Sequence, residues 1–358
     1  MIGTMKRSIL FLFTFSVVSL SLLAEAPAGY YTKAVGTSKQ GLKTALHQII
    51  SSGAKDLGYS NLYDIYAESD VTDDGKVWDM YSTCSWTPGQ KKCGNYSKVC
   101  DCYNREHSIP QSWFNEKSPM KSDAFHVYPT DGKVNGQRSN YPFGECSGGT
   151  SLGGKALGRL GNSTFSGYSG KVFEPDDQYK GDFARTYFYF VTRYQDKMST
   201  MSGDSFAKNT YPSLSSWSID LFLKWHRQDP VSQKEIDRND AVYGFQKNRN
   251  PFIDHPELAE YIWGNKMGQV WNGATALDDE TLLNGVIINY TREDKTLHLR
   301  TDETPNMRYS IYSMTGVLMQ QGALQGSEHH ISTPYPGGIY ILHLYAGEQI
   351  KTVKFAVH

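Results

Sequence analysis

The feature that most restricts the fold of this chain is a glutamate followed directly by a histidine, Glu106 and His107, in the run "NREHSIPQSWF". A second polar run, "VNGQRSN", contains Asn135 and follows about thirty residues later. Adjacent side chains of a regular strand point to opposite faces, so the pair cannot face one cleft along a straight strand. We therefore expect the pair to lie where a strand bends or ends, and Pro110 supports an irregular exit.

These residue types are the ones that metal-assisted hydrolysis of a phosphodiester requires. Mg²⁺ keeps several waters and takes one or two protein oxygens, so one carboxylate and one amide oxygen are a sufficient set of protein ligands. Glu106 and Asn135 supply such a set. An imidazole with an ordinary pKa of about 6.5 can accept a proton from water at neutral pH, which makes His107 the candidate general base.

The two runs, in full "NREHSIPQSWF" and "YPTDGKVNGQRSNYPFGE", resemble the bacterial endonuclease I family of secreted nucleases that do not discriminate between sugars. The resemblance extends from about residue 30 to about residue 265 and includes "WHRQDPVSQKEIDRNDAVYGFQKNRNPFIDHPEL". It implies an α+β fold in which helices surround a ββα-metal (His-Me finger) core. It also implies that Glu106 and Asn135 hold Mg²⁺, or Mn²⁺ or Ca²⁺ in its place, and that His107 is catalytic.

Three further residues are candidates for contact with substrate. Arg138 and Asn140 are candidates to hold a phosphate, Arg138 through its forked guanidinium; the alternative is a salt bridge or a turn. The family places an arginine for the leaving group between the Glu-His pair and Asn135, but the cations of this stretch are lysines, and we choose Lys121. A lysine supplies a point charge and cannot form the bidentate contact.

The N-terminal segment has the pattern of a secretory signal peptide. Two basic residues, Lys6 and Arg7, precede an apolar stretch over residues 9–23, and small residues follow it. The stretch is short for a membrane span, so a retained anchor is the less favoured alternative. We expect residues 1–28 to be removed on export through the periplasm. The mature protein would then be a monomer without a stable membrane span, either secreted or at the cell surface.

The sequence has five cysteines, four of them within nineteen residues just before the Glu-His pair. They are Cys84, Cys93, Cys100 and Cys102, followed later by Cys146. In an exported protein this pattern favours one or two disulfides that fix the loop leading to the active-site strand, with the pairing open. A four-cysteine zinc site is the alternative, but intervals of eight, six and one residue do not match the spacing of zinc knuckles.

The charge balance argues against a protein that binds nucleic acid by bulk electrostatics. The formal net charge is −1, whereas such proteins usually carry a marked basic excess. Between residues 100 and 140 the sequence has five basic and five acidic residues. An enzyme that turns over needs only a few well-placed cations and a metal, so a nuclease remains compatible with this balance.

Helical spacing of apolar residues predicts a helix over residues 41–52 and a second helix with a buried aromatic stripe after Asp182, which we expect to be its N-cap. Ser232 and Glu235 predict the capping box of a later helix. Residues 147–170 are rich in glycine, serine and threonine, which predicts a surface loop or loose hairpin. A calcium-loop pattern that starts at Asp70 fails at Tyr81, so an Asp-Gly turn is predicted there.

The pattern changes after about residue 270, where short alternating runs such as "GIYILHLYAG" and "IKTVKFAVH" are separated by Gly, Asn and Pro. These runs predict a small antiparallel β-sandwich. The final stretch, "ISTPYPGGIYILHLYAGEQIKTVKFAVH", resembles the C-terminal sorting domains of the type IX secretion system, which implies the secretion machinery as a partner. The alternative is a carbohydrate-binding or packing module. We therefore divide the chain into residues 1–28, 29–275 and 276–358.

The sequence lacks the motifs of two other enzyme classes, zinc proteases and serine hydrolases. No His-Glu-x-x-His occurs, and "GYSG" within residues 165–170 is one residue short of a nucleophile elbow. We predict a secreted, metal-dependent and largely sequence-non-specific endonuclease for DNA, RNA or both. The alternative from another class is a cell-surface glycan- or protein-binding module with an inactive nuclease-like core.

Overall fold

The computed structural model describes residues 26–273, 286–291, 294–301, 307–313, 316–346 and 349–357. The chain divides into two compact units, Met1–Gly273 and Ala274–His358, and each is described by itself. Residues 1–25 of the predicted signal peptide lie outside the described residues. Within the described ranges, no helix combines the length and the apolar character that crossing a membrane requires.

The first unit combines helices with small antiparallel sheets, which agrees with the predicted α+β class. Its α-helices are α1 (Lys39–Ser51), α2 (Leu62–Ser69), α3 (Gly132–Arg138), α4 (Lys180–Arg193), α5 (Ser216–Gln228), α6 (Gln233–Gln246), α7 (Pro251–Asp254) and α8 (Leu258–Ile262). Its 3-10 helices are η1 (Thr32–Ala34), η2 (Tyr59–Asn61), η3 (Gln111–Phe114), η4 (Met120–Ser122), η5 (Asp177–Tyr179) and η6 (Gln195–Thr200). Its strands are β1 (Tyr103–His107), β2 (Val127–Asp131), β3 (Thr150–Ser151), β4 (Arg159–Asn162) and β5 (Lys171–Glu174).

Helix α4 forms the centre of the core of this unit and contacts α1, α5 and α7. Its aromatic stripe is buried as predicted, and the side chains concerned are Phe183, Tyr187, Phe190, Val191 and Tyr194. Each such side chain stabilises the fold by about 1.5–3 kcal/mol when it is fully buried. The helix predicted over residues 41–52 is confirmed as α1, which buries Leu42, Leu46, Ile49 and Ile50.

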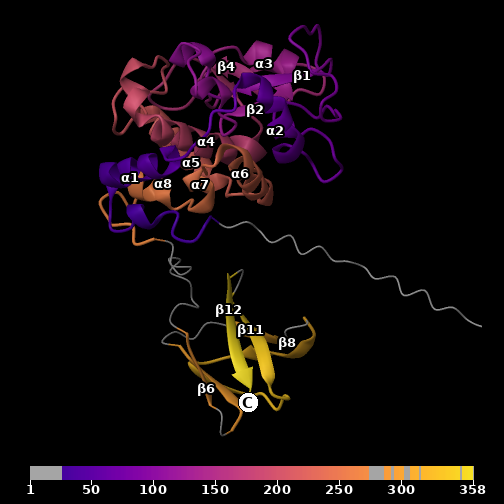
Figure 1. Ribbon diagram of the computed structural model, residues 1–358, viewed down its shortest axis with the longest axis vertical. Helices are drawn as coiled ribbons and strands as arrows, with labels where there is room; N and C mark the ends of the chain where they lie inside the picture. The colour runs from indigo at the N-terminus through magenta and orange to yellow at the C-terminus, as the bar shows by residue number, and fades with distance from the viewer. Residues whose placement is uncertain are drawn as a thin grey trace, which may run out of the picture. The chain divides into compact units, whose positions relative to one another are not determined.

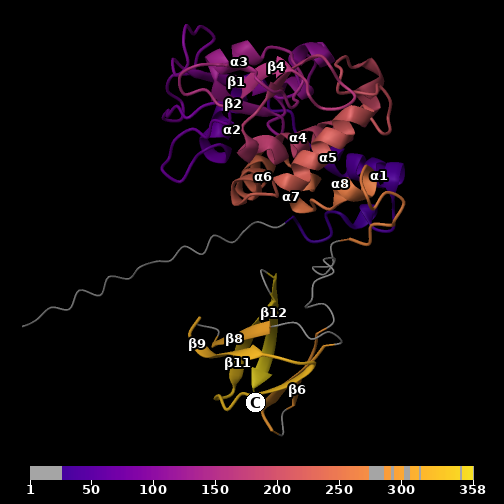
Figure 2. The same cartoon turned by 180° about the vertical axis from the view of Figure 1, so that it is seen from behind.

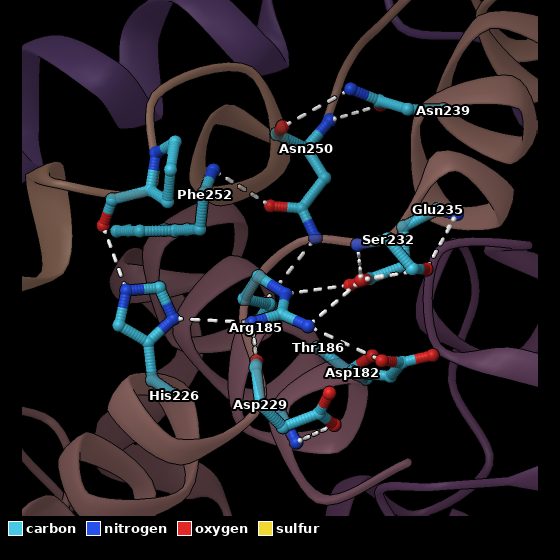
Figure 3. Close-up of polar contacts among 12 residues, drawn as sticks. Asp182, Arg185, Thr186, His226, Asp229, Ser232, Glu235, Asn239, Asn250 and Phe252 are labelled. Carbon is cyan, nitrogen blue, oxygen red and sulfur yellow. Dashed lines mark hydrogen bonds and ion pairs between the residues drawn. The ribbon is translucent and has the colours of Figure 1, made fainter. Parts of the chain in front are cut away.

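A buried arginine on α4 links this helix to α5 and α6 (Figure 3). Arg185 Nε and Nη2 donate to the two carboxylate oxygens of Glu235 at 2.6 and 2.8 Å, and Nη1 donates to the carbonyl of Asp229 at 2.7 Å. Glu235 also accepts from the backbone of Ser232, so the capping box predicted for α6 is confirmed. The α6 N-terminus is thereby fixed on the central helix.

The prediction that Asp182 is the N-cap of α4 is wrong. The helix begins at Lys180, the N-cap position is Tyr179, and Asp182 lies in the first turn. Its carboxylate accepts a hydrogen bond from Arg185 Nη2 at 3.2 Å. A buried guanidinium needs nearby negative charge, and this tertiary requirement decides the place of Asp182.

The glycine-rich stretch 147–170 forms β3 and β4, which pair with β5 in an antiparallel sheet of order β3-β4-β5. Of the two predicted possibilities, a surface loop or a loose hairpin, the structure contains the hairpin. The predicted turn near Asp70 is also present, because Gly75 donates its N–H to the carbonyl of Thr72 and has a φ of +75°. Asp70 itself is buried in an ion pair with Arg238, so it does not serve a calcium loop.

The second unit consists of antiparallel strands in its described parts: β6 (Ile287–Thr291), β7 (Thr296–Arg300), β8 (Met307–Ser313), β9 (Leu318–Leu324), β10 (Glu328–Ser332), β11 (Gly338–Ala346) and β12 (Gln349–Val357). One sheet has the order β10-β7-β6 and the other β12-β11-β8-β9. Alternate residues of both sheets enter one hydrophobic cluster, as Leu297, Leu299, Ile311 and Leu342 illustrate. The predicted short antiparallel strands are confirmed, and the complete sandwich stays a prediction.

Candidate active site

The candidate catalytic residues lie on a β1-β2-α3 unit. Within the first unit, both views place this group at the end away from α1 and α8 (Figures 1 and 2). Strands β1 and β2 pair in antiparallel fashion, with Glu106 opposite Tyr128 and His107 opposite Val127. Strand β1 ends at His107, as we expected for the Glu-His pair.

One aspartate fixes the turn from β2 into α3. Asp131 is the N-cap of α3, and its Oδ1 accepts from the backbone N–H groups of Lys133 and Val134 at 2.8 and 3.0 Å. Its Oδ2 accepts from the backbone N–H of Cys100 at 2.7 Å. An N-cap of this kind stabilises a helix by about 1 kcal/mol, and here it also binds the helix start to the cysteine-rich loop.

Glu106 is buried and faces α3. Its Oε1 accepts from Arg138 Nη1 at 2.7 Å and from the Tyr81 hydroxyl at 2.8 Å. Burial raises the pKa of Glu106 to about 7, while the charge of Arg138 and the hydrogen bond from Tyr81 oppose this rise. Among the described residues, Oε2 of Glu106 has no hydrogen-bond donor, so one carboxylate oxygen remains for a ligand.

Arg138 is buried between α3 and the end of β1, and its side chain is 1% exposed. Besides Glu106, its guanidinium donates to the carbonyls of His107 and Ser108 at 2.7 and 2.6 Å. These contacts hold the end of β1 against the last turn of α3. The expected contact of Arg138 with a substrate phosphate stays a prediction, and the observed contacts match the salt-bridge alternative.

Asn135 faces the same side of β1 as Glu106. Its Nδ2 donates to Oδ1 of Asn104 at 2.8 Å and more weakly to the carbonyl of Arg105 at 3.4 Å. These bonds fix which way the amide points and leave Oδ1 without a donor among the described residues. The half-buried Tyr96 lies over the following Gly136, where a Cβ would lie 2.0 Å from the Tyr96 hydroxyl and would force that side chain to shift.

His107 faces the opposite side of β1 and is 5% exposed. Its Nε2 lies 2.9 Å from the carbonyl of Lys121, and a carbonyl can only accept, so Nε2 carries the proton and Nδ1 the lone pair. The ring packs near Tyr59, Phe114 and His126. Burial, aided by His126, lowers the pKa of His107 to about 3, so the imidazole is neutral at physiological pH.

In the described part of the chain, the side chains of Lys121 and Asn140 form no hydrogen bond with Glu106, His107 or Asn135. Lys121 Nζ pairs with Glu116 at 2.7 Å, and it lies 5.4 Å from the ring centre of Tyr59, next to His107. Asn140 is exposed two residues after the end of α3. Their proposed contacts with substrate stay predictions.

Sequence reasoning did not identify the residues that support the site. Asp131 caps α3 and Tyr81 donates to Glu106, but neither received a role from the sequence: Asp131 stands inside the run that resembles the family, and Tyr81 stands in a stretch without a site motif. Tyr59 carries the cation of Arg105 on its ring, at 3.6 Å from the ring centre. The one available signal was the alternation of β1, which places Arg105 and His107 on the same face.

The cysteine-rich loop is closed by disulfides between Cys84 and Cys100 and between Cys93 and Cys102, while Cys146 is free and buried. The predicted bridges upstream of the Glu-His pair are confirmed. The zinc alternative is wrong, because these sulfurs are consumed in disulfides. Among the described residues, Cys84, Cys100 and Asp131 are the His, Cys, Asp or Glu side chains close enough to share a metal ion. The two cysteines of this group are joined in a disulfide, so their sulfurs are not free to bind one.

The oxygens left over on the α3 side of β1 suit a divalent metal ion. Glu106 Oε2 and Asn135 Oδ1 are hard donors, and Mg²⁺ takes few protein oxygens. The charge of Glu106 is already balanced by Arg138, so a bound dication would leave the site positive towards a phosphate. The residues present therefore fit a metal ion.

Comparison with known proteins gives a consistent result. The family described as Endonuclease I matches residues 38–257. The extracellular ribonuclease of Bacillus amyloliquefaciens is 37% identical over 242 residues, which cover 65% of this chain and 78% of that protein. The corresponding ribonuclease of Bacillus subtilis is 36% identical with the same coverage. An extracellular deoxyribonuclease of Aeromonas hydrophila is 25% identical over 197 residues, 50% of this chain and 74% of that protein.

Proposed function

This chain belongs to the endonuclease I family and is an endonuclease, and on that premise we propose that it is a secreted, metal-dependent nuclease with His107 as general base. The observation that carries the proposal is the arrangement at the end of β1. There Glu106 and Asn135 offer oxygens on one face, and a neutral His107 with a fixed tautomer lies on the other. Because the strand ends at His107, a phosphate lying across this end can approach both faces.

The residues of the chain divide the chemistry between them. Glu106 and Asn135 would hold Mg²⁺, Mn²⁺ or Ca²⁺, and the ion when bound supplies neutralisation of charge on the phosphate. His107 Nδ1 accepts the proton of the attacking water, while the bond from Nε2–H to the Lys121 carbonyl keeps the ring in place. Arg138 holds Glu106 and the backbone of β1 in position.

The substrate follows from the same family. Relatives named as ribonucleases and as deoxyribonucleases both match this chain, which supports a nuclease that accepts RNA, DNA or both. A site built on phosphate chemistry does not need to contact the sugar. Lys121 and Asn140 are the cation and the amide that we propose for contacts with the substrate backbone.

The ends of the chain support export. Relatives are named as extracellular or periplasmic proteins, and we propose that residues 1–28 are a signal peptide. The family match ends at residue 257, well before the β-rich unit Ala274–His358. We propose that this second unit is a sorting domain that engages secretion machinery. An inactive core is not proposed, because Glu106, His107 and Asn135 are all present.

The test of the proposed base is the His107→Ala variant. General-base removal should lower kcat on plasmid DNA and on RNA by about two to four orders of magnitude at saturating Mg²⁺. Because the ring is buried, the melting temperature should fall, but the variant should stay folded at the assay temperature. His47→Gln changes a half-buried histidine on α1 and serves as the matched control. Cleavage by His107→Ala at a near wild-type rate would refute the assignment.

The metal site has its own test. Mn²⁺ binding, followed by calorimetry, should weaken about tenfold or more in Glu106→Gln and in Asn135→Ala. Chelation with EDTA should stop cleavage by the wild type. Unchanged Mn²⁺ affinity in both variants would place the ion elsewhere.

A further inference from the structure

A cavity of about 340 Å³ lies beside the candidate active site, along β1 at Asn104 and Arg105. Its lining residues are Tyr59, Tyr63, Lys92, Gly94, Asn104 and Arg105, together with the half-cystine Cys93. Pockets that bind small ligands begin at about 300 Å³, so the space is sufficient for one nucleoside. Its walls come from three segments that are far apart in the sequence: η2 with α2, the disulfide loop, and β1.

The cavity adjoins both halves of the proposed catalytic site. Asn104 in its wall accepts the hydrogen bond from Asn135 Nδ2. Tyr59 in its wall lies 5.7 Å from His107, measured between ring centres. A nucleotide seated in the cavity would therefore be a neighbour of the phosphodiester that is cut.

The cavity combines aromatic rings with cations. The guanidinium carbon of Arg105 lies 3.6 Å from the ring centre of Tyr59 and 4.8 Å from that of Tyr63. Lys92 Nζ lies 4.9 Å from the ring centre of Tyr63. Rings of this kind stack on nucleobases of any sequence, and nearby cations bind the backbone phosphates.

Arg105 and Lys92, the cations of the cavity, differ from most arginines of the first unit because they have no carboxylate partner among the described residues. Of the eight arginines within residues 26–273, six form ion pairs with carboxylates. Arg105 forms none among the described residues, where its guanidinium donates one hydrogen bond, to the carbonyl of Tyr59 at 2.9 Å. Lys92 is exposed and likewise has no carboxylate partner in the described parts. Their charge is thus available to an anion from outside.

We propose that this cavity binds one unpaired nucleotide of a single-stranded RNA or DNA substrate, with its base against Tyr63 and an adjoining phosphate at Lys92 and Arg105. The inference rests on the proposed nuclease function, since it assigns the cavity to the same substrate. A base can enter only when it is not paired and stacked within a duplex. The cavity thereby favours single strands and unpaired ends, without preference for sequence.

The test measures binding in EDTA, so that it does not depend on cleavage. A fluorescent single-stranded pentanucleotide is compared, by anisotropy, with pentanucleotides that lack the base at one position each. For the wild type, loss of the base at one position should weaken binding about tenfold. Tyr63→Leu should bind the complete strand about tenfold more weakly and be insensitive to that missing base, while Tyr63→Phe should behave as the wild type.

A second variant keeps the test independent of folding effects at Tyr63. Lys92→Met removes an exposed cation of the cavity, and Lys98→Met removes an exposed cation of the same loop outside it. Only Lys92→Met should reduce the slope of log affinity against log salt concentration, by about 0.7. The proposal is overturned if Tyr63→Leu keeps the sensitivity to the missing base, or if the two lysine variants have equal slopes. Failure of the nuclease assignment would instead appear in the cleavage assay of His107→Ala.

Discussion

Arg138 provides the sharpest test of how the site is assembled. In Arg138→Met the hydrophobic length of the side chain is kept, but Glu106 loses its buried partner and the carbonyls of His107 and Ser108 lose a donor. Removing one member of a buried ion pair costs about 3–5 kcal/mol, because the remaining carboxylate must either stay charged without its partner or take up a proton. For a domain of this size, about 2–4 °C of melting temperature corresponds to each kcal/mol. We therefore expect a fall of about 6 to 20 °C.

Thermal unfolding followed by circular dichroism measures this fall, and steady-state kinetics on the same samples measure its effect on catalysis. If Arg138 positions Glu106 without touching the substrate, kcat should fall about tenfold or more with KM nearly unchanged. Arg138→Lys should recover part of the stability, since it restores a charge near Glu106 but not the forked geometry. Arg227→Met, which breaks an exposed pair with Glu260, is the control and should cost less than about 1 kcal/mol.

The opposite result is equally clear. If the Arg138→Met variant has the melting temperature of the wild type, a raised KM and an unchanged kcat, the arginine binds substrate and the positioning role is refuted. The phosphate contact expected from the sequence would then be correct.

Three further predictions concern the rest of the chain. Serine at both Cys84 and Cys100 should lower stability by about 3 kcal/mol, the chain-entropy value for a loop of this length, and should lower activity with it; full activity in the doubly substituted protein would contradict this. Burial lowers the pKa of Lys43 to about 7. Between pH 7 and about 10 the unfolded chain therefore binds more protons than the folded chain, and the free energy of unfolding should rise with pH by up to about 1.4 kcal/mol per pH unit. Lys43→Met should flatten this rise, and an identical pH dependence in urea titrations of both proteins would exclude the buried lysine as its cause. A chain that ends at residue 275 should cleave nucleic acid within about twofold of the full-length rate, because every proposed catalytic residue lies in the first unit; a folded but inactive truncated protein would show that the second unit takes part in catalysis.

The sequence predicts helices well where the spacing of apolar residues decides them. The aromatic stripe of α4 and the capping box at Ser232 and Glu235 depend on neighbours within one or two turns, and both are confirmed. Asp182 failed as an N-cap because its partner is Arg185, whose own position depends on Glu235 of another helix. Tertiary ion pairs of this kind leave no periodic trace in the sequence.

The same distinction applies to the site. The motif placed Glu106 and His107 where a strand bends or ends, and β1 ends at His107; it assigned Asn135 to no element, and the structure has it on α3. It could not show that Arg138 turns inward, since an arginine three residues after Asn135 has the same local sequence whether it is buried or exposed. The disulfide pairing was equally inaccessible, because four clustered cysteines allow several pairings and the choice depends on how the loop folds over α3.

The double use of Asp131 has a consequence for the cell that makes this protein. One carboxylate oxygen caps the helix that carries Asn135, and the other accepts from the backbone N–H of Cys100, which is disulfide-bonded to Cys84. In a compartment that keeps thiols reduced, this loop lacks its covalent closure. If the loss of activity predicted for the Cys84 and Cys100 substitutions is found, a chain still awaiting export would be a poor nuclease, and the RNA and DNA of its host would be spared without a dedicated inhibitor. Growth of cells that produce residues 29–358 in a reducing or an oxidising cytoplasm would measure this protection, and equal toxicity in both would rule it out.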